Sequence, residues 1–265
     1  MADAADRPLL TVRDLVKNFG GLRAIDHADL DVKRGTITGL IGPNGAGKTT
    51  LFNIVTGFIP PDSGRVVFRG DDVTHLPPYR IFEKKMCRTF QIPREHRSMT
   101  VLENLMLVPE GQHGERVWNN WLRPHTVKAE EARLRAQALE VLEFVQLDHL
   151  AGEPAANLSG GQKKLLELAR VLMAEPELVL LDEPGAGVNP TLMRRLAEMI
   201  ETLRSERGIT FLLIEHDMDL VMTLCDPVVV MSEGKKLMEG APAQVRHDPA
   251  VLEAYLGGQY AALDG

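Results

Sequence analysis

Aromatic residues and cysteines are both scarce in this chain, and each scarcity excludes a class of protein. Phe, Trp and Tyr make up 5% of the 265 residues while 44% are hydrophobic, so the core must be mainly aliphatic, as in buried parallel sheets. Two cysteines far apart, Cys87 and Cys225, are typical of reduced thiols and not of a disulfide-stabilised secreted domain. We therefore expect a cytosolic protein with an aliphatic core.

Long apolar runs and long basic runs are also missing. No stretch approaches the ~20 consecutive apolar residues that a membrane-spanning helix needs, and the acidic, polar residues 1–8 do not form a signal-peptide pattern. The net charge is −7, and without a basic run the sequence does not indicate a nucleic-acid partner. A role at a membrane would therefore require another chain that holds this one there.

The most informative motif that is present is a phosphate-binding loop of the form G-x-x-x-x-G-K-[ST]. An apolar run at 37–41 predicts a buried strand before it, and residues 50–55 predict a helix after it. Glycines let backbone N–H groups surround phosphate oxygens, and the helix N-terminus adds partial positive charge. The alternative is a glycine-rich turn that matches by chance. The residues expected to contact nucleotide are Gly42, Pro43, Asn44, Gly45, Ala46, Gly47, Lys48, Thr49 and Thr50.

Within this loop two side chains have distinct expected roles. Lys48 offers a positive charge to the β- and γ-phosphates, and the hydroxyl of Thr49 can reach a magnesium ion.

A predicted strand that ends in two acidic residues supplies the next part of the site. Residues 178–181 are aliphatic and are followed by Asp182 and Glu183, which is a Walker B pattern. We expect Asp182 to lie beside the loop and hold magnesium through water, with Glu183 where a water could attack the γ-phosphorus. Taken alone, the pattern also fits a strand that meets a turn. Its order along the chain relative to the loop favours the functional interpretation.

Residues 158–162, Leu-Ser-Gly-Gly-Gln, predict a second anion site. Ser159 can cap a helix over 163–174, and Gly160 and Gly161 expose N–H groups at its start. An ordinary Ser-Gly-Gly helix cap is the alternative. Two phosphate sites with one Walker B pattern suggest that the second site serves the nucleotide of a partner subunit, which predicts a dimer.

Strand and helix patterns alternate in a way that predicts an α/β fold with a mostly parallel sheet. Short runs at 9–12 and 28–32 predict antiparallel strands, and residues 93–157 predict a helical subdomain that includes a helix over 128–146. Buried strands are then expected at 178–181, 210–214 and 228–231, with a helix over 191–207. No pattern explains residues 109–124.

In this order the motifs resemble those of the ATP-binding cassette (ABC) ATPases over nearly the whole chain. The match rests on residues 42–49, Gln91, residues 158–162, Asp182-Glu183 and His216. It implies a P-loop NTPase fold with a single domain over 9–257. Residues 9–92 and 163–257 would form a RecA-like core with an antiparallel β subdomain. Residues 93–162 would form a helical subdomain that ends in the signature motif.

The resemblance also implies roles for single residues. Gln91 resembles the Q-loop glutamine that senses magnesium and the attacking water, Glu183 the general base, and His216 the switch histidine at the γ-phosphate. Phe19 lies where an aromatic often stacks on adenine. Taken singly, Gln91 also fits a polar loop residue, His216 a structural histidine and Phe19 a core residue.

In such proteins two cassettes close head-to-tail around two ATP molecules with Mg²⁺. The signature residues Ser159, Gly160, Gly161 and Gln162 would then contact the nucleotide held by the other cassette. The chain departs from the family at Asn189, where many members have an aspartate. Asparagine keeps the hydrogen-bonding ability and loses the charge, which puts communication across the dimer in doubt.

A narrower resemblance is to the branched-chain amino acid uptake cassettes of the LivG type, carried by residues 88–91, 99–105, 183–190, 214–218 and 254–257. Urea and lipopolysaccharide cassettes share parts of this pattern. The resemblance implies an ATPase on the cytoplasmic side of the inner membrane, bound peripherally to two membrane-spanning permease subunits. A second cassette, identical or related, would complete the pair, and a solute-binding protein would act through the permease. A soluble scaffold ATPase stays an alternative, whereas a P-loop kinase leaves residues 158–162 unexplained.

Overall fold

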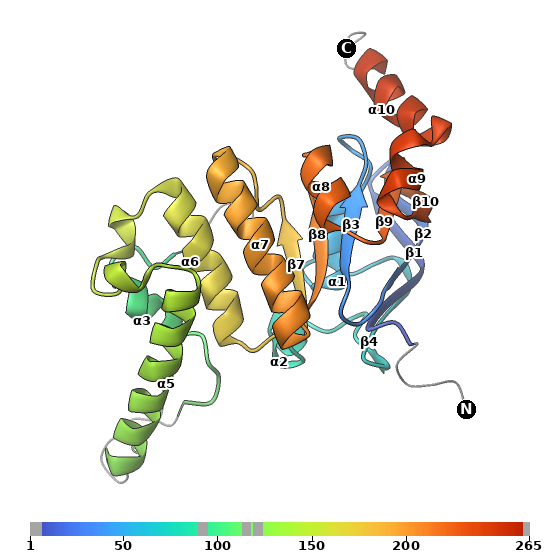
Figure 1. The fold of residues 1–265 in the computed structure, drawn as a ribbon. Helices are drawn as coiled ribbons and strands as arrows, with labels where there is room; N and C mark the ends of the chain where they lie inside the picture. Colours follow the sequence, from blue (N-terminus) through green and yellow to red (C-terminus); the bar gives the residue numbers. More distant parts are fainter. Residues whose placement is uncertain (1–6, 90–94, 113–117, 119–123, 262–265) are drawn as a thin grey trace. The chain divides into compact units, whose positions relative to one another are not determined.

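The computed structural model describes residues 7–89, 95–112, 118 and 124–261, and the chain divides into two compact units (Figure 1). The first unit consists of Met1–Arg88, Glu177–Gly185 and Ala197–Gly265. The second consists of Thr89–Pro176 and Ala186–Leu196.

The first unit contains an antiparallel sheet of four strands in the order β2-β1-β4-β5. β1 (Leu10–Phe19) and β2 (Leu22–Val32) form a hairpin, and β4 (Ser63–Phe68) and β5 (Asp71–Asp72) extend the sheet beyond β1. The antiparallel strands expected at 9–12 and 28–32 are confirmed, and the hairpin is longer than expected because pairing continues through its polar residues.

The same unit contains a six-stranded sheet in the order β10-β9-β3-β8-β7-β6. Only β10 is antiparallel to its neighbour; the other pairs are parallel, which confirms the expected mostly parallel α/β sheet. Each residue of β3, β7 and β8 is buried, as continuous aliphatic runs require. The strands are β3 (Ile37–Ile41), β6 (Met86–Arg88), β7 (Leu178–Asp182), β8 (Thr210–Ile214), β9 (Val228–Ser232) and β10 (Lys235–Gly240).

A helix that follows β3 joins both sheets in one aliphatic core. α1 (Lys48–Val55) buries Leu51, Phe52, Ile54 and Val55 in a cluster that also holds residues of β1, β3 and β8. This packing fixes where the loop before α1 lies. The other helices of the unit are α2 (Pro78–Glu83), α8 (Met218–Leu224), α9 (Pro242–His247) and α10 (Pro249–Ala261).

The second unit is helical in its described residues. α3 (Val101–Met106), α5 (Pro124–Phe144) and α6 (Gly160–Met173) contact one another pairwise, with 3₁₀ turns at Asp148–Leu150 and Ala155–Asn157. The helices expected over 128–146 and 163–174 are confirmed as α5 and α6. The sequence-based boundary between 162 and 163 falls inside α6. α7 (Pro190–Arg207) starts in this unit and ends in the first.

Across the described ranges, none of the helices combines the length and apolar character needed to cross a bilayer.

Candidate active site

The phosphate-binding loop is shaped by two glycines. It leaves β3 at Gly42 (φ 150°), where an added Cβ would lie 2.1 Å from the carbonyl oxygen of Met231. It enters α1 at Gly47 (φ 97°), where an added Cβ would lie 2.5 Å from the carbonyl oxygen of Ala24. Both clashes are with backbone, which cannot move aside as a side chain can. Since the N-cap Gly47 has no capping side chain, the start of α1 is suited to an external anion.

Lys48 is folded into the loop. Its side chain is buried, and Nζ donates hydrogen bonds to the carbonyl oxygens of Gly42 (2.7 Å) and Pro43 (2.9 Å). Burial lowers the pKa of Lys48, while the charges of Glu183 and Asp182 act in the opposite direction. A buried ammonium held by neutral carbonyls gains from an incoming anion. The geometry therefore fits the phosphate contact predicted from the motif.

A cleft of about 520 Å³ opens beside the loop. Its wall includes residues 44–50 of the loop and α1, residues 22–24 of β2, and Phe19 at the end of β1. Phe19 is 46% exposed, so the alternative that it is a core residue is wrong. Its stacking on adenine stays a prediction. Glu183, His216 and Glu233, which follow β7, β8 and β9, complete the wall.

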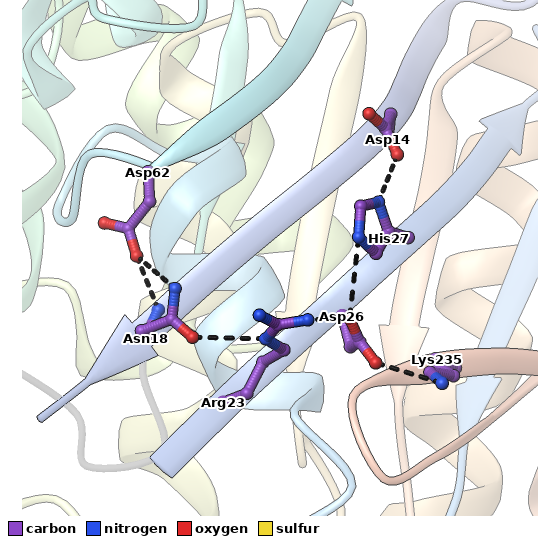
Figure 2. A network of polar contacts seen from close by, with 7 residues as sticks. All are labelled: Asp14, Asn18, Arg23, Asp26, His27, Asp62 and Lys235. Carbon is purple, nitrogen blue, oxygen red and sulfur yellow. Dashed lines mark hydrogen bonds and ion pairs between the residues drawn. The ribbon is translucent and has the colours of Figure 1, made fainter. Parts of the chain in front are cut away.

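A chain of polar contacts holds this wall in place (Figure 2). Arg23, which lines the cleft, donates from Nε to Asn18 Oδ1 (3.3 Å) and from Nη1 to Asp26 Oδ1 (2.9 Å). Asn18 donates to Asp62, and Lys235 pairs with Asp26 at 3.0 Å. Hydrogen bonds from Lys235 and Arg23 lower the pKa of Asp26. The Arg23 guanidinium is therefore fixed at the cleft although its side chain is half exposed.

The turn between β9 and β10 is bonded to both the loop and β2. The N–H of Gly234 donates to the carbonyl of Ala46 at 3.1 Å, and the carbonyl of Gly234 accepts from the N–H of Asp26 at 2.9 Å. An added Cβ at Gly234 (φ 79°) would lie 2.9 Å from the carbonyl oxygen of Ala24. The turn therefore fixes the distance between the loop and β2.

Asp182, the last residue of β7, is buried against a cation supplied by the chain itself. Its Oδ2 lies 2.6 Å from Nη2 of Arg88 on β6, and both side chains are 7% exposed. Nη1 of Arg88 donates to Asn53 Oδ1 of α1 at 2.6 Å. One guanidinium thus connects the strand that carries Asp182 to the helix that follows the loop.

The donor set near the loop fits a magnesium ion held chiefly by phosphate and water. No cluster of three or more His, Cys, Asp or Glu in the described part of the chain could hold a metal by itself. Mg²⁺ at nucleotide sites takes one or two protein oxygens and keeps phosphate and water ligands. The Asp182 carboxylate, which already attracts a cation, and the hydroxyl of the exposed Thr49 match that requirement.

Glu183 and His216 form a pair at the cleft. Glu183 Oε1 lies 2.7 Å from His216 Nε2, and the Glu183 side chain is the less exposed of the two. Glu183 has φ 49°, a left-handed conformation that costs a non-glycine residue about 1–3 kcal/mol. Its N–H donates to the carbonyl of Ile214 at 3.0 Å, which helps to hold that conformation. A carboxylate held in this way beside a phosphate-binding loop can accept a proton from water.

The predicted signature lies in the second unit, at the start of α6. Ser159 and Gln162 form a capping box: the Gln162 N–H donates to Ser159 Oγ (3.3 Å) and the Ser159 N–H donates to Gln162 Oε1 (2.8 Å). Ser159 and Gly160 are exposed, and an added Cβ at Gly160 would meet no atom within 4 Å. The predicted helix cap is confirmed, while contact with a partner's nucleotide stays a prediction.

Asn189, the departure from the family pattern, has a local structural role. Its Oδ1 accepts a hydrogen bond from the N–H of Leu192 at 2.9 Å, at the start of α7. Asparagine and aspartate cap helices about equally well, so the missing charge does not weaken this start.

One predicted site residue lies outside the described structure, and the motifs did not predict several residues that the structure places at the site. Gln91 lies outside the described residues. The Arg88–Asp182 pair and the cleft positions of Arg23 and Glu233 were missed, because each depends on contacts between distant segments. No strand was predicted at 86–88, so the sequence contained no structural signal for Arg88 beyond its place in the resemblance at residues 88–91.

Comparisons with family models place the chain among known proteins. A model described as "ABC transporter" matches residues 25–186. A second, described as "Branched-chain amino acid ATP-binding cassette transporter", matches residues 235–261.

Individual relatives are similar over nearly their full length. A probable branched-chain amino acid transport ATP-binding protein LivG of Archaeoglobus fulgidus is 44% identical, covering 95% of this chain and 96% of the relative. The high-affinity branched-chain amino acid transport ATP-binding protein BraF of Pseudomonas aeruginosa is 40% identical, covering 95% and 98%. Among solved structures, a nucleotide-free ATP-binding cassette from an ABC transporter has a TM-score of 0.80 at 38% identity, covering 93% and 98%.

Proposed function

The chain belongs to the ABC transporter family, and from this premise we propose that it is the ATP-hydrolysing subunit of an importer for branched-chain amino acids. Its partners in the proposal are two membrane-spanning permease subunits and a second cassette, and a solute-binding protein acts through the permease. The chain works peripherally at the cytoplasmic side of the inner membrane.

The observation that carries ATP hydrolysis is the arrangement at the cleft. A buried lysine lies in a loop suited to phosphate, and a Glu–His pair 2.7 Å apart lines the same cleft. Binding and proton transfer can therefore occur in one place.

Nucleotide binding involves the loop and the wall of β1 and β2. Lys48 exchanges its carbonyl partners for β- and γ-phosphate oxygens, the N–H groups of residues 44–50 surround the phosphates, and Phe19 stacks on adenine. Thr49, Asp182 and Gln91 would hold Mg²⁺, which would neutralise negative charge on the phosphates when bound.

Hydrolysis follows at the Glu183–His216 pair. Glu183 accepts a proton from the water whose oxygen attacks the γ-phosphorus. The bond to the bridging oxygen breaks, and ADP leaves with that electron pair. His216 contacts the γ-phosphate and keeps the carboxylate oriented. Positioning and charge do most of this work, because the protein forms no covalent intermediate.

A second cassette completes the site. The signature residues of one cassette contact the γ-phosphate of the ATP held by the other cassette; they are Ser159, Gly160, Gly161 and Gln162. Two ATP molecules therefore hold the two cassettes together. Closing and reopening then move the permease subunits. The exposed start of α6 supports this role.

The solute class is supported by the relatives and not by the site. The match over residues 235–261 and the 40–44% identity to branched-chain amino acid cassettes favour that solute over urea or lipopolysaccharide. The site supports ATP hydrolysis for any of these cargoes.

The experiment that tests the proposal is native purification of the tagged full chain from solubilised membranes, with identification of the recovered proteins. Two permease subunits and a second cassette are expected, and liposomes containing this complex should take up radiolabelled leucine when ATP is supplied. Uptake of urea in place of leucine would contradict the solute class. Recovery of water-soluble partners alone would overturn the transport role in favour of a scaffold ATPase.

A further inference from the structure

A buried carboxylate is hydrogen-bonded to the backbone beside the two residues proposed for hydrolysis. Glu215 follows the fully buried strand β8 and is only 4% exposed. Isolated ionised carboxylates are costly to bury, so they need hydrogen-bond donors. Each oxygen of Glu215 has one: Oε1 accepts from the N–H of Gly185 at 2.7 Å, and Oε2 accepts from the N–H of His216 at 3.1 Å.

The two donors belong to different segments. Gly185 lies two residues after Glu183, beyond the end of β7, whereas His216 lies beyond the end of β8. The same segments are joined twice more, by the Glu183 N–H donating to the Ile214 carbonyl and by the Glu183–His216 side-chain contact. The Glu215 carboxylate therefore closes a ring that contains both reactive side chains.

This ring explains how Glu183 keeps its left-handed backbone. A non-glycine residue at φ 49° relaxes unless the residues on either side are held. β7 holds the preceding side, and the Gly185–Glu215 hydrogen bond holds the following side. Releasing Gly185 would let Glu183 rotate and carry its carboxylate away from His216.

We propose that Glu215 is a positioning residue for ATP hydrolysis, which holds Glu183 and His216 through the Gly185 and His216 N–H groups. The role rests on the proposed function, and Glu215 itself touches no reacting atom. Burial raises the pKa of Glu215, and the N–H groups of Gly185, His216 and Asp217 act in the opposite direction. Both carboxylate oxygens are needed as acceptors, a pattern that an amide of equal size cannot supply.

Glu215→Gln tests this role because it preserves side-chain volume and replaces one acceptor oxygen by an NH₂ group. In the purified complex, where the second cassette completes the site, we expect kcat to fall about 10-fold, the rate change that matches one misplaced hydrogen bond, with KM and Kd for MgATP within about 2-fold of wild type. Glu215→Asp keeps two acceptor oxygens and should retain more activity than Glu215→Gln. Glu177→Gln is the control: it removes ion pairs to Arg34 and Arg69 just before β7 and should leave kcat unchanged.

A second measurement does not depend on ATPase activity. Amide hydrogen exchange of the nucleotide-free protein should be faster at Gly185 and His216 in Glu215→Gln than in wild type, and unchanged in Glu177→Gln. A wild-type kcat in Glu215→Gln, or loss of MgATP affinity in proportion to kcat, would overturn the positioning role. A wild-type complex with both cassettes present but without ATPase activity would count against the proposed function. The exchange rates would still decide whether Glu215 holds the two segments, because unchanged rates would overturn that role.

Discussion

The chain has two helix starts that are suited to anions, and they are built differently. α1 starts after a glycine-rich loop that has no capping side chain and leads into the buried Lys48. Gly42 and Gly47 let this loop lie against the backbone of β9 and β2, where a larger residue would clash. α6 starts with a Ser159–Gln162 capping box and an exposed glycine, Gly160. The first start needs an anion to balance its buried charge, whereas the second is already satisfied locally. We infer that the first binds nucleotide alone and that the second contributes only when a nucleotide is brought to it.

The largest expected effect is on the chemistry beside the first helix start. Glu183→Gln removes the proton acceptor and should lower kcat about 1,000-fold, equivalent to about 4 kcal/mol, while ATP binding is retained. Size-exclusion chromatography with ATP should show a trapped closed pair that wild type does not accumulate. Unchanged turnover would remove Glu183 as the base.

The next largest effect is on stability, and it compares two ion pairs that differ in burial. Arg88→Met leaves the buried Asp182 without its guanidinium and should lower the free energy of unfolding by about 3 kcal/mol. Lys163→Met at the start of α6 breaks a pair with Glu95 whose side chains are 21% and 9% exposed, and should lower it by less, about 1–2 kcal/mol. Urea denaturation measures both.

The double variant Arg88→Met/Asp182→Asn should recover most of the stability lost by Arg88→Met, because no buried carboxylate is then left unpaired. If the Arg88 and Lys163 variants lost equal free energy of unfolding, the more buried Arg88–Asp182 pair would contribute no more to stability than the Lys163–Glu95 pair.

Lys48→Ala tests whether the first helix start binds nucleotide by charge. Loss of the ammonium should weaken MgATP binding about 30-fold, equivalent to about 2 kcal/mol, as expected for a charge-assisted hydrogen bond. Fluorescence titration with a labelled ATP gives Kd. Lys163→Met provides the matched control, and an equal loss of affinity there would mean that nucleotide binding does not distinguish the two helix starts.

The smallest expected effect concerns the cap of α6. Ser159→Ala should lower stability by about 1 kcal/mol and leave ATP affinity of the single chain unchanged, yet reduce hydrolysis by the assembled pair. Thr100→Ala removes the equivalent capping box of α3 and should cost similar stability without affecting hydrolysis. Identical ATPase rates for the two variants would assign Ser159 a capping role only.

Residues that work through their immediate neighbours were predictable from the sequence. The loop, the acidic end of β7, the Ser159 cap and the alternation of strands with helices each depend on patterns within a few residues. Strand lengths were less predictable: β1 and β2 pair through polar residues with register shifts, which breaks the alternation that predicts strands.

Contacts that depend on sheet register were not predictable. Arg88 reaches Asp182 because β6 and β7 pair with Arg88 opposite Leu180, two residues before the carboxylate. Glu215 reaches Gly185 because β7 and β8 end together, with Asp182 opposite Ile214. A single sequence does not indicate which strands are neighbours. The contacts of Arg88 with Asp182 and of Glu215 with Gly185 could therefore be identified only from the fold.

The Gly234 turn has a consequence for how this protein can be divided. The match to the C-terminal family model of branched-chain amino acid cassettes begins at residue 235, immediately after a turn whose backbone is bonded to Ala46 of the phosphate-binding loop and to Asp26. A chimaera joined at that point would graft a foreign strand onto β9 and alter the support of the nucleotide site. Because β10 pairs with β9 up to Gly240, an exchangeable C-terminal module begins only after that residue.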